Sequence, residues 1–402
     1  MTAASRRRAF LAERLGVTPI QLAVEPLDLP LKHTFTIARS SESVAKTAIL
    51  RLRWNGLEGL GESAPSERYD ENVASVRAGL EALHLGDDPY AFERLLDGLP
   101  PAQKCGLDIA LHDLIGKDLD RPLWRLLGLD PARTPRTSFT IGIAPLGETL
   151  AKVREVGSHP VIKVKLGSGA ELETVEAIRS AYAGAIRIDA NEGWTPEQAV
   201  DLLSELAKFE IEFCEQPIPA GSPEKLRWIR ERSPIPLVTD EDSKDANDLP
   251  ALLGCVDGVN VKLVKCGGIR GALEMIHTAR AMGLKIMLGC MIESQILTTA
   301  AAHLSPLVDW ADLDGPFLTA RAMGLKIMLG CMIESQILTT AAAHLSPLVD
   351  WADLDGPFLT AHDPFAGIAY ADGKIVLPDG PGLGVTPSTS SRQAELREAS
   401  LS

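Results

Sequence analysis

The chain has 402 residues, a formal net charge of −14 and a sequence pI of about 5.1. This acidic balance lacks the basic footprint of a nucleic-acid-binding protein, so an anionic substrate would need a local cluster of cations. Hydrophobic residues make up 45% of the chain, which is enough for a full core. No apolar run reaches the ~18 residues that span a membrane. These properties indicate a globular chain.

The ends of the chain and its cysteines favour a cytoplasmic protein. No apolar stretch follows Arg6 to Arg8, so the N-terminus is not a secretory signal, and we expect residues 1–18 to be disordered. The six cysteines form no Cys-x-x-Cys pair, which is typical of reduced, buried thiols. The polar tail 386–402 is also expected to be disordered.

Residues 19–133 predict an α+β domain. The alternating run 46–54 indicates an antiparallel strand, and the segment 105–128 has a helical pattern. Near the other end of the chain, 362–385 has the pattern of a hairpin and an extended piece. We expect this piece to complete the α+β domain.

From residue 134 onward, short apolar runs alternate with helical patterns. Continuous aliphatic runs are typical of strands that are buried on both faces of a parallel sheet. Thr195-Pro196 with Gln198 predicts a helix start with a capping box, and Ser222-Pro223 repeats the signal. The apolar runs cover 138–143, 161–167, 185–191, 211–217, 236–242, 259–268 and 285–294.

An ionisable residue recurs in five successive runs at intervals of 25 or 26 residues: Lys163, Asp189, Glu215, Asp240 and Lys265. One strand and helix per about 25 residues is the cadence of a (β/α)₈ barrel, in which chemistry sits at the C-terminal ends of the strands. We therefore expect residues 134–361 to form an α/β (β/α) barrel with these side chains at its mouth. The alternative, a set of unrelated loop charges, does not explain why the five residues recur at nearly equal intervals.

Three of the five residues, Asp189, Glu215 and Asp240, are carboxylates from adjacent strands. Hard oxygen ligands suit Mg²⁺, and clustered carboxylates without a cation would raise one another's pKa. The sequence therefore predicts a magnesium site.

The lysines indicate proton transfer. Lys163 and Lys165 flank one residue and so face the same side of a strand, while Lys265 closes a strand across the ring. Two lysines on either side of a metal-bound carboxylate can remove and return a carbon-bound proton, with the metal stabilising the enediolate. Burial and neighbouring cations would lower their pKa toward neutrality. Lys262 is expected to point to the opposite face and to be structural.

Together these residues resemble the enolase superfamily, and within it the dipeptide epimerases of the muconate-lactonizing-enzyme subgroup. The resemblance runs from about residue 20 to 385 and implies a TIM-like barrel with an N-terminal α+β capping domain. A lysine or histidine base with Mg²⁺ is this superfamily's pattern. The motifs are Lys-Val-Lys at 163–165, Asp-Ala-Asn at 189–191, Glu-Gln-Pro at 215–217, Asp-Glu-Asp at 240–242 and Lys-Cys-Gly-Gly at 265–268.

The resemblance implies a Mg²⁺-dependent isomerase that inverts the α-carbon of the C-terminal residue of a dipeptide, of the L-Ala-D/L-Glu type. The reaction would be a two-base 1,1-proton transfer through a metal-stabilised enediolate. Lys165 and Lys265 would be the acid/base pair, and Lys163 would neutralise the substrate carboxylate. The implied Mg²⁺ ligands are Asp189, Glu215 and Asp240.

The same resemblance implies contacts to the substrate. Asp312 and Asp314, an Asp-x-Asp after the eighth strand, would hold the ammonium of the dipeptide, and Arg39 would bind a glutamate side chain. Thr140 and Glu293 match other substrate-contact positions. Asp242 departs from the family, which more often has Ser there. The repeated block described next contains copies of three of these residues as Asp353, Asp355 and Glu334.

Residues 278–318 recur without any change as 319–359. Repeat folds use three or more diverged copies, so we interpret this as a tandem duplication, or a gene-assembly error, that repeats strand 7, helix 7 and strand 8. A barrel has no room for both copies, and we expect one to be extruded, with Asp353 and Asp355 as the working pair and with activity surviving deletion of 306–346. The extruded copy would promote aggregation or a domain-swapped homo-oligomer.

Two kinds of alternative remain. An o-succinylbenzoate synthase, an N-acylamino acid racemase or a muconate cycloisomerase would share the scaffold, but their substrates have no ammonium for an aspartate pair to bind. A non-catalytic metal-binding barrel, inactivated by the duplication, would bind Mg²⁺ without proton exchange.

Overall fold

The computed structural model describes residues 18–157 and 159–315 and, beyond them, only short segments. Of the segments that we expected to be disordered, 1–17 and 388–402 lie outside the described residues. So do two candidate residues from the second copy, Glu334 and Asp355. The expectation of disorder is wrong for Thr386–Pro387, which form a strand, β17, that pairs antiparallel with β14 (Phe365–Ala366). The short segments are 328–330, 351–353, 365–366, 369–371, 374–376, 379–381 and 386–387.

The N-terminal part, which we call the cap, is built on a three-stranded antiparallel sheet in the order β1-β2-β3. Its long second strand confirms the prediction at 46–54. Gly61 lets the sheet approach helix α4 closely, because a Cβ there would lie 2.1 Å from the carbonyl oxygen of Gly106. The cap elements are β1 (Gln21–Ile37), β2 (Ser40–Trp54), β3 (Leu57–Ser63), α2 (Val73–Glu81), α3 (Phe92–Leu96), α4 (Pro101–Asp118) and α5 (Leu123–Leu126).

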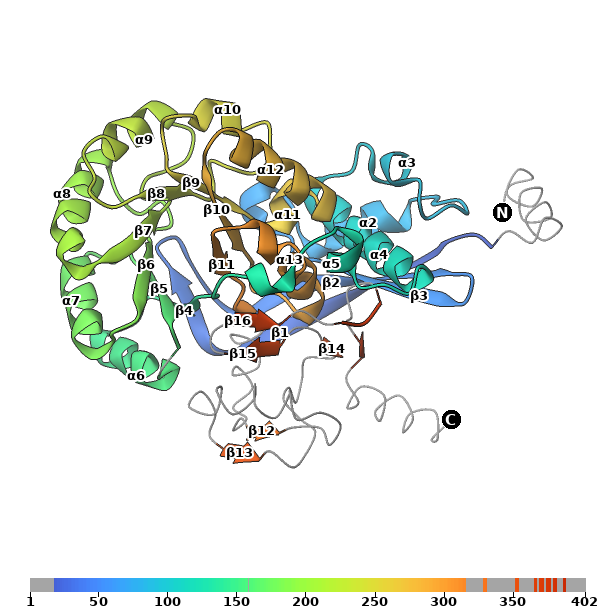
Figure 1. Cartoon of the computed structure of the whole chain (residues 1–402), viewed down its shortest axis with the longest axis horizontal. Helices are drawn as coiled ribbons and strands as arrows, with labels where there is room; N and C mark the ends of the chain where they lie inside the picture. Colours follow the sequence, from blue (N-terminus) through green and yellow to red (C-terminus); the bar gives the residue numbers. More distant parts are fainter. Residues whose placement is uncertain are drawn as a thin grey trace.

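Eight parallel strands follow in chain order and form the predicted barrel (Figure 1). A bridge between Thr137 and Ala311 joins the start of the first strand to the last, so the sheet nearly closes on itself. The strands are β4 (Phe139–Ile141), β5 (Val161–Lys165), β6 (Ala185–Asp189), β7 (Ile211–Glu215), β8 (Leu237–Thr239), β9 (Gly258–Val261), β10 (Lys285–Gly289) and β11 (Trp310–Asp312).

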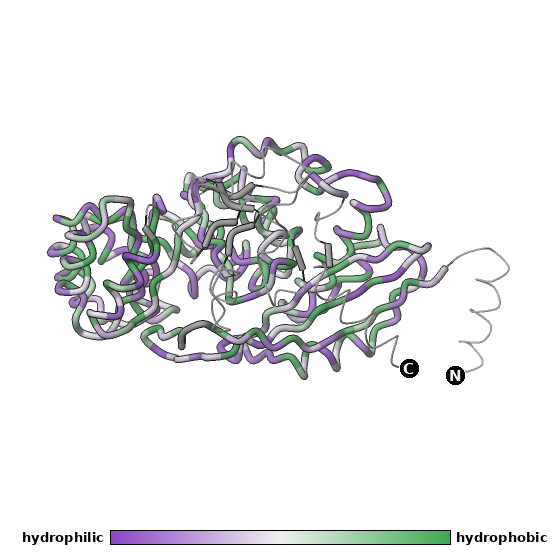
Figure 2. The backbone as a smooth tube through the Cα atoms, turned by 90° about the horizontal axis from the view of Figure 1, so that it is seen from below, coloured by the Kyte–Doolittle hydropathy of each residue, from purple (hydrophilic) through white to green (hydrophobic). Residues whose placement is uncertain are grey.

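Helices surround the strands on the outside, and hydrophobic and hydrophilic residues alternate along them (Figures 1 and 2). This pattern lets one helix face pack on the barrel while the other meets water. The capping box of Thr195 with Gln198 is present, whereas Ser222 makes no side-chain cap bond. The helices are α6 (Leu146–Val156), α7 (Glu171–Ala181), α8 (Pro196–Leu206), α9 (Pro223–Arg230), α10 (Leu249–Leu252), α12 (Ile269–Ala281) and α13 (Gln295–Ala302).

The apolar run 259–268 is not one strand, as we had expected. β9 ends at Val261, and a helical turn, α11 (Leu263–Cys266), begins at once with Lys262 as its N-cap. The alternation of side chains between two strand faces therefore does not extend from Lys262 to Lys265.

The last barrel strand comes from the first copy of the duplicated block. The described parts of the second copy are β12 (Met328–Gly330) and β13 (Trp351–Asp353), which pair with each other in a separate two-stranded parallel sheet. Their register repeats that of β10 and β11, because Met287 pairs with Trp310 just as Met328 pairs with Trp351. Our expectation that the second copy closes the barrel is thus corrected.

Further along, β15 (Ala369–Ala371) and β16 (Lys374–Val376) form the predicted hairpin. The five cysteines within the described ranges are free thiols, and all but Cys290 are buried. None of the helices in the described part of the chain combines the length and the apolar character that crossing a membrane requires.

Candidate active site

Three carboxylates meet at the barrel mouth, as predicted. Asp189 ends β6, Glu215 ends β7 and Asp240 follows β8, and each is at most 4% exposed. Neighbouring amides hold two of them in place: the backbone N–H of Asn191 donates to Asp189 Oδ1 at 2.9 Å, and Asn260 Nδ2 donates to Glu215 Oε1 at 2.7 Å. Consecutive parallel strands thus bring together carboxylate oxygens that lie far apart in the sequence.

Positive charge does not balance the three carboxylates equally: despite burial, nearby lysines hold the pKa values of Asp189 and Asp240 below the usual range, but not that of Glu215. Burial and the charges of Asp189 and Asp240 raise the pKa of Glu215 to about 7. Glu215 Oε2 is buried and accepts no hydrogen bond, although Lys163 Nζ lies 2.5 Å away. Within the described ranges, no three acidic, histidine or cysteine side chains stand at the spacing of a formed metal site. Asp189 and Asp240 instead face Lys165 and Lys262, yet a hard divalent cation fits this donor set because it would relieve the repulsion.

Lys165 and Lys262 flank the cluster in matching positions. Lys165 Nζ lies 2.7 Å from Asp189 Oδ2, and Lys262 Nζ lies 2.9 Å from Asp240 Oδ2. Their side chains are 10% and 11% exposed, so both remain accessible from the mouth. Our expectation that Lys262 points away is wrong, because this residue starts a helical turn and does not continue β9.

Lys265, the predicted second base, is bound to acceptors on every side. Its side chain is 1% exposed. Its Nζ donates to Asp240 Oδ1 at 2.5 Å and to the carbonyl oxygens of Asp240, Ser243 and Asn260 at 2.6, 3.0 and 3.3 Å. An ammonium has only three N–H donors, so this group is fully engaged in holding Asp240 and the following loop.

Lys163 is almost completely buried. Its Nζ is 2.5 Å from Glu215 Oε2, 2.7 Å from Asp312 Oδ2 and 3.2 Å from Asp189 Oδ2. Burial alone would lower its pKa, but Asp312, Glu215 and Asp189 hold the pKa well above the usual value. Lys163 is therefore an internal counter-charge that joins the carboxylate cluster to Asp312.

The Asp-x-Asp of the first copy lies beside this cluster. Burial opposes ionisation of Asp312, but Lys163 and a hydrogen bond from Ser138 Oγ keep its pKa low. Burial and the charge of Asp312 raise the pKa of Asp314 to about 6, and Asp314 Oδ2 accepts from the backbone N–H of Thr140 at 2.5 Å. Thr140 thus orders the pair, while Asp353 lies in the separate β12–β13 sheet.

Glu293 is brought near the site but not into its mouth. The side chain is fully buried and accepts from the N–H of Met291 at 3.0 Å and from Thr298 Oγ1 at 3.1 Å. Burial and the nearby Glu62 raise its pKa well above the usual value. The Glu293 carboxylate therefore accepts hydrogen bonds from residues close to it in the chain.

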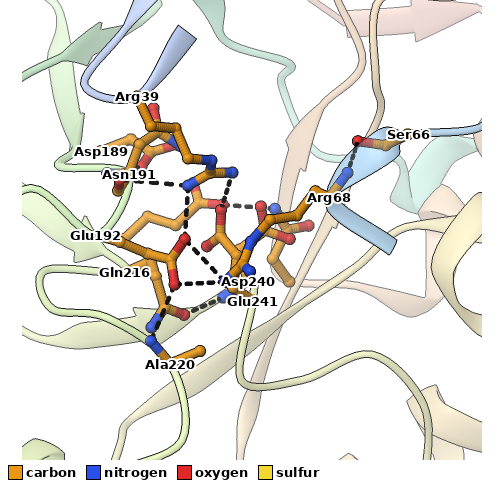
Figure 3. A network of polar contacts seen from close by, with 12 residues as sticks. Arg39, Ser66, Arg68, Asp189, Asn191, Glu192, Gln216, Ala220, Asp240 and Glu241 are labelled. Atoms are coloured by element: carbon orange, nitrogen blue, oxygen red, sulfur yellow. Dashed lines mark hydrogen bonds and ion pairs between the residues drawn. The ribbon is translucent and has the colours of Figure 1, made fainter. Parts of the chain in front are cut away.

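Arg39 reaches the mouth from the turn between β1 and β2 (Figure 3). Its Nη1 lies 2.9 Å from Glu192 Oε2, and its Nη2 lies 2.5 Å from Glu241 Oε1. Arg68, also from the cap, binds Glu192 Oε1 at 2.8 Å. Sequence reasoning missed Glu192, Glu241 and Arg68. The available signal was position, since Glu192 follows the motif at 189–191 and Glu241 follows Asp240 directly.

Comparison with known proteins agrees with this arrangement of cap and barrel. Residues 146–313 match the model of the family described as "Enolase C-terminal domain-like". Residues 20–128 match that of the "Mandelate racemase / muconate lactonizing enzyme, N-terminal domain".

Individual relatives match over most of their length. The chain is 35% identical to an L-Ala-D/L-Glu epimerase of Bacteroides thetaiotaomicron, over 90% of this chain and 86% of that protein. It is 40% identical to an L-Ala-D/L-amino acid epimerase of Pedosphaera parvula, over 75% of this chain and 91% of that protein. A dipeptide epimerase of Enterococcus faecalis, solved with Mg and L-Leu-L-Tyr, superposes with a TM-score of 0.76 at 30% identity, over 92% of this chain and 100% of that chain. With both of its parts matched, the chain belongs to the enolase superfamily, in its mandelate racemase and muconate lactonizing enzyme group.

Proposed function

We propose that this protein is a Mg²⁺-dependent dipeptide epimerase that inverts the α-carbon of the C-terminal residue. The observation that carries the proposal is the placement of Lys165 and Lys262 on either side of the carboxylate cluster, each bound to one of its outer members. Inversion requires a proton to leave one face of a carbon and return to the other. Two lysines on opposite sides meet that requirement.

Asp189, Glu215 and Asp240 would hold Mg²⁺, and the E. faecalis relative was solved with Mg. The cation would supply positive charge beside the substrate carboxylate, which makes the α-proton easier to remove. Lys165 removes this proton from one face and Lys262 delivers one to the other, with the roles reversed for the opposite epimer.

The other lysines support this pair. We propose that Lys265 holds Asp240 in place and is not itself the base, since its ammonium already binds three carbonyl oxygens. Lys163 neutralises part of the negative charge of the carboxylates. Asp312 and Asp314 would bind the ammonium of the dipeptide, because Asp312 stays ionised beside Lys163 and a pair of acids suits a cation. The cap, residues 19–133 with 362–385, would close over the substrate.

Incubation with Mg²⁺ and a dipeptide library in D₂O tests the proposal. We expect a gain of one mass unit on Ala-Glu-type dipeptides, because the α-proton is replaced from solvent, together with formation of the second epimer. Gain on N-succinylated or N-acylated amino acids with none on dipeptides would favour the racemases of the same scaffold. Mg²⁺ binding without exchange on any substrate would indicate a non-catalytic barrel.

Replacement of Arg39 by Met tests which dipeptide is preferred. If Arg39 leaves Glu241 to bind an acidic side chain, the KM for L-Ala-L-Glu should rise by about tenfold, because a charged hydrogen bond contributes ~1.5 kcal/mol or more. The KM for L-Ala-L-Leu should then stay unchanged. An equal rise for both substrates would instead show that Arg39 only fastens the cap to Glu192 and Glu241.

A further inference from the structure

A carboxylate of the cap accepts hydrogen bonds from the N-terminus of a barrel helix. Asp108 of α4 is fully buried, and its Oδ2 accepts from the backbone N–H of Ile269 at 2.6 Å and of Arg270 at 3.4 Å. These are the first residues of α12, whose own N-cap position, Gly268, has no side chain to do this. A carboxylate at a helix N-terminus satisfies free N–H groups and complements the helix dipole.

The contact is close enough to fix the backbone. A Cβ on Gly268 would lie 2.5 Å from Asp108 Oδ2, and one on Gly267 would lie 2.8 Å from Cδ of Lys104, also in α4. Both glycines have positive φ, +103° and +83°, which other residues rarely adopt. The chain between α11 and α12 therefore passes against α4 with no space for a side chain.

Hydrogen bonds connect this contact to the second base. The N–H of Gly268 donates to the carbonyl of Leu263 at 2.8 Å. The N–H groups of Lys265 and Cys266 donate to the carbonyl of Lys262 at 3.0 and 3.2 Å. Lys262 thus begins a single helical turn whose far end is held by Asp108.

Lys165 has no such connection. It is the last residue of β5, which lies between β4 and β6 in the barrel sheet. Its position is set by the strand ladder, in which Lys165 pairs with Asp189. Lys262 and Lys165 are therefore held in position by different contacts.

We propose that Asp108 is a positioning residue for Lys262 and not for Lys165. This inference rests on the proposed epimerase reaction. Loss of Asp108 releases the end of the α11 turn, so Lys262 moves relative to the substrate while Lys165 stays in place.

Exchange measured separately on the two epimers distinguishes the bases. Overall epimerisation must slow equally in both directions, because its equilibrium constant is fixed. Exchange of the α-proton with D₂O without inversion is different, since it needs only the lysine that removes the proton from that epimer. The Lys262→Met variant first identifies the epimer of Ala-Glu whose exchange requires Lys262.

In the Asp108→Ala variant, exchange of that epimer should fall by about tenfold and exchange of the other by less than about twofold, because small displacements of a catalytic group are costly. Asp108→Asn should recover most of the loss, since the amide oxygen can still accept from Ile269. If Asp108→Ala does not fold, Asp108→Ser provides the same ratio.

Asp113→Ala is the matched control. Asp113 lies in the same helix and is equally buried, but it accepts from the N–H of Leu60 at 2.7 Å, within the cap. This variant should be less stable to heat yet keep the wild-type ratio of the two exchange rates. Equal slowing of both epimers by Asp108→Ala would overturn the inference, whereas a wild-type protein that exchanges neither epimer would overturn the proposed function itself.

Discussion

Replacement of Lys262 by Met should lower epimerisation by about 10³-fold, because a positioned acid/base group contributes ~10²–10⁴-fold to such reactions. The ammonium of Lys262 is the group placed opposite Lys165 across the carboxylate cluster, 2.9 Å from Asp240 Oδ2. One epimer should still exchange its α-proton with D₂O, because Lys165 remains. Mass spectrometry of each epimer, before and after inversion, measures both effects.

Lys265→Met is the variant that separates base from support. Lys265 is buried among carbonyl oxygens and Asp240, and removing one partner of a buried pair costs ~3–5 kcal/mol. We therefore expect a lower melting temperature and an equal loss of exchange on both epimers. If Lys265→Met instead stays stable and loses exchange on one epimer only, the base is Lys265, as we predicted from the sequence.

The duplication allows a second test with an internal control. Asp312→Asn should reduce kcat/KM for dipeptides by about 100-fold, since hydrogen bonds to charged groups contribute ~1.5–3 kcal/mol and Lys163 also loses its partner at 2.7 Å. Asp353→Asn changes the identical residue of the identical sequence. It should leave kcat/KM unchanged, because β13 lies outside the barrel sheet.

Kinetics of the two single variants and of the double variant decide which copy forms the site. The reverse pattern, with loss in Asp353→Asn alone, would place the second copy in the barrel. Loss only in the double variant would show that either copy can complete the site, which contradicts a single arrangement of the chain.

The barrel was predictable because its strands are aliphatic runs, and β5 to β9 each have a charged residue at or directly after the C-terminal end. The runs at 161–167, 185–191 and 211–217 contain β5, β6 and β7, and the carboxylates follow in phase. The choice between Lys262 and Lys265 was not predictable in this way. The helical turn at Leu263–Cys266 is as aliphatic as the strand before it, so composition does not reveal where β9 ends.

Two other features depend on information that the local sequence does not contain. Arg39 meets Glu192 across 153 positions of the chain, and such pairs arise only once the cap has docked. The choice between two identical copies cannot follow from their sequence at all. The first copy forms the barrel strands because the chain continues directly from α12 into β10 and β11.

The separate β12–β13 pair also has a genetic consequence. Because residues 278–320 equal those 41 positions later, a cut of 41 residues that begins anywhere from Thr278 to Arg321 leaves the same chain of 361 residues. One recombination event between the copies would therefore restore a protein with the same barrel strands. Until that happens, substitutions that would disable the first copy can accumulate in the second without touching the catalytic centre. The repeat thus gives the chain a spare barrel segment that can change while the first copy stays as it is.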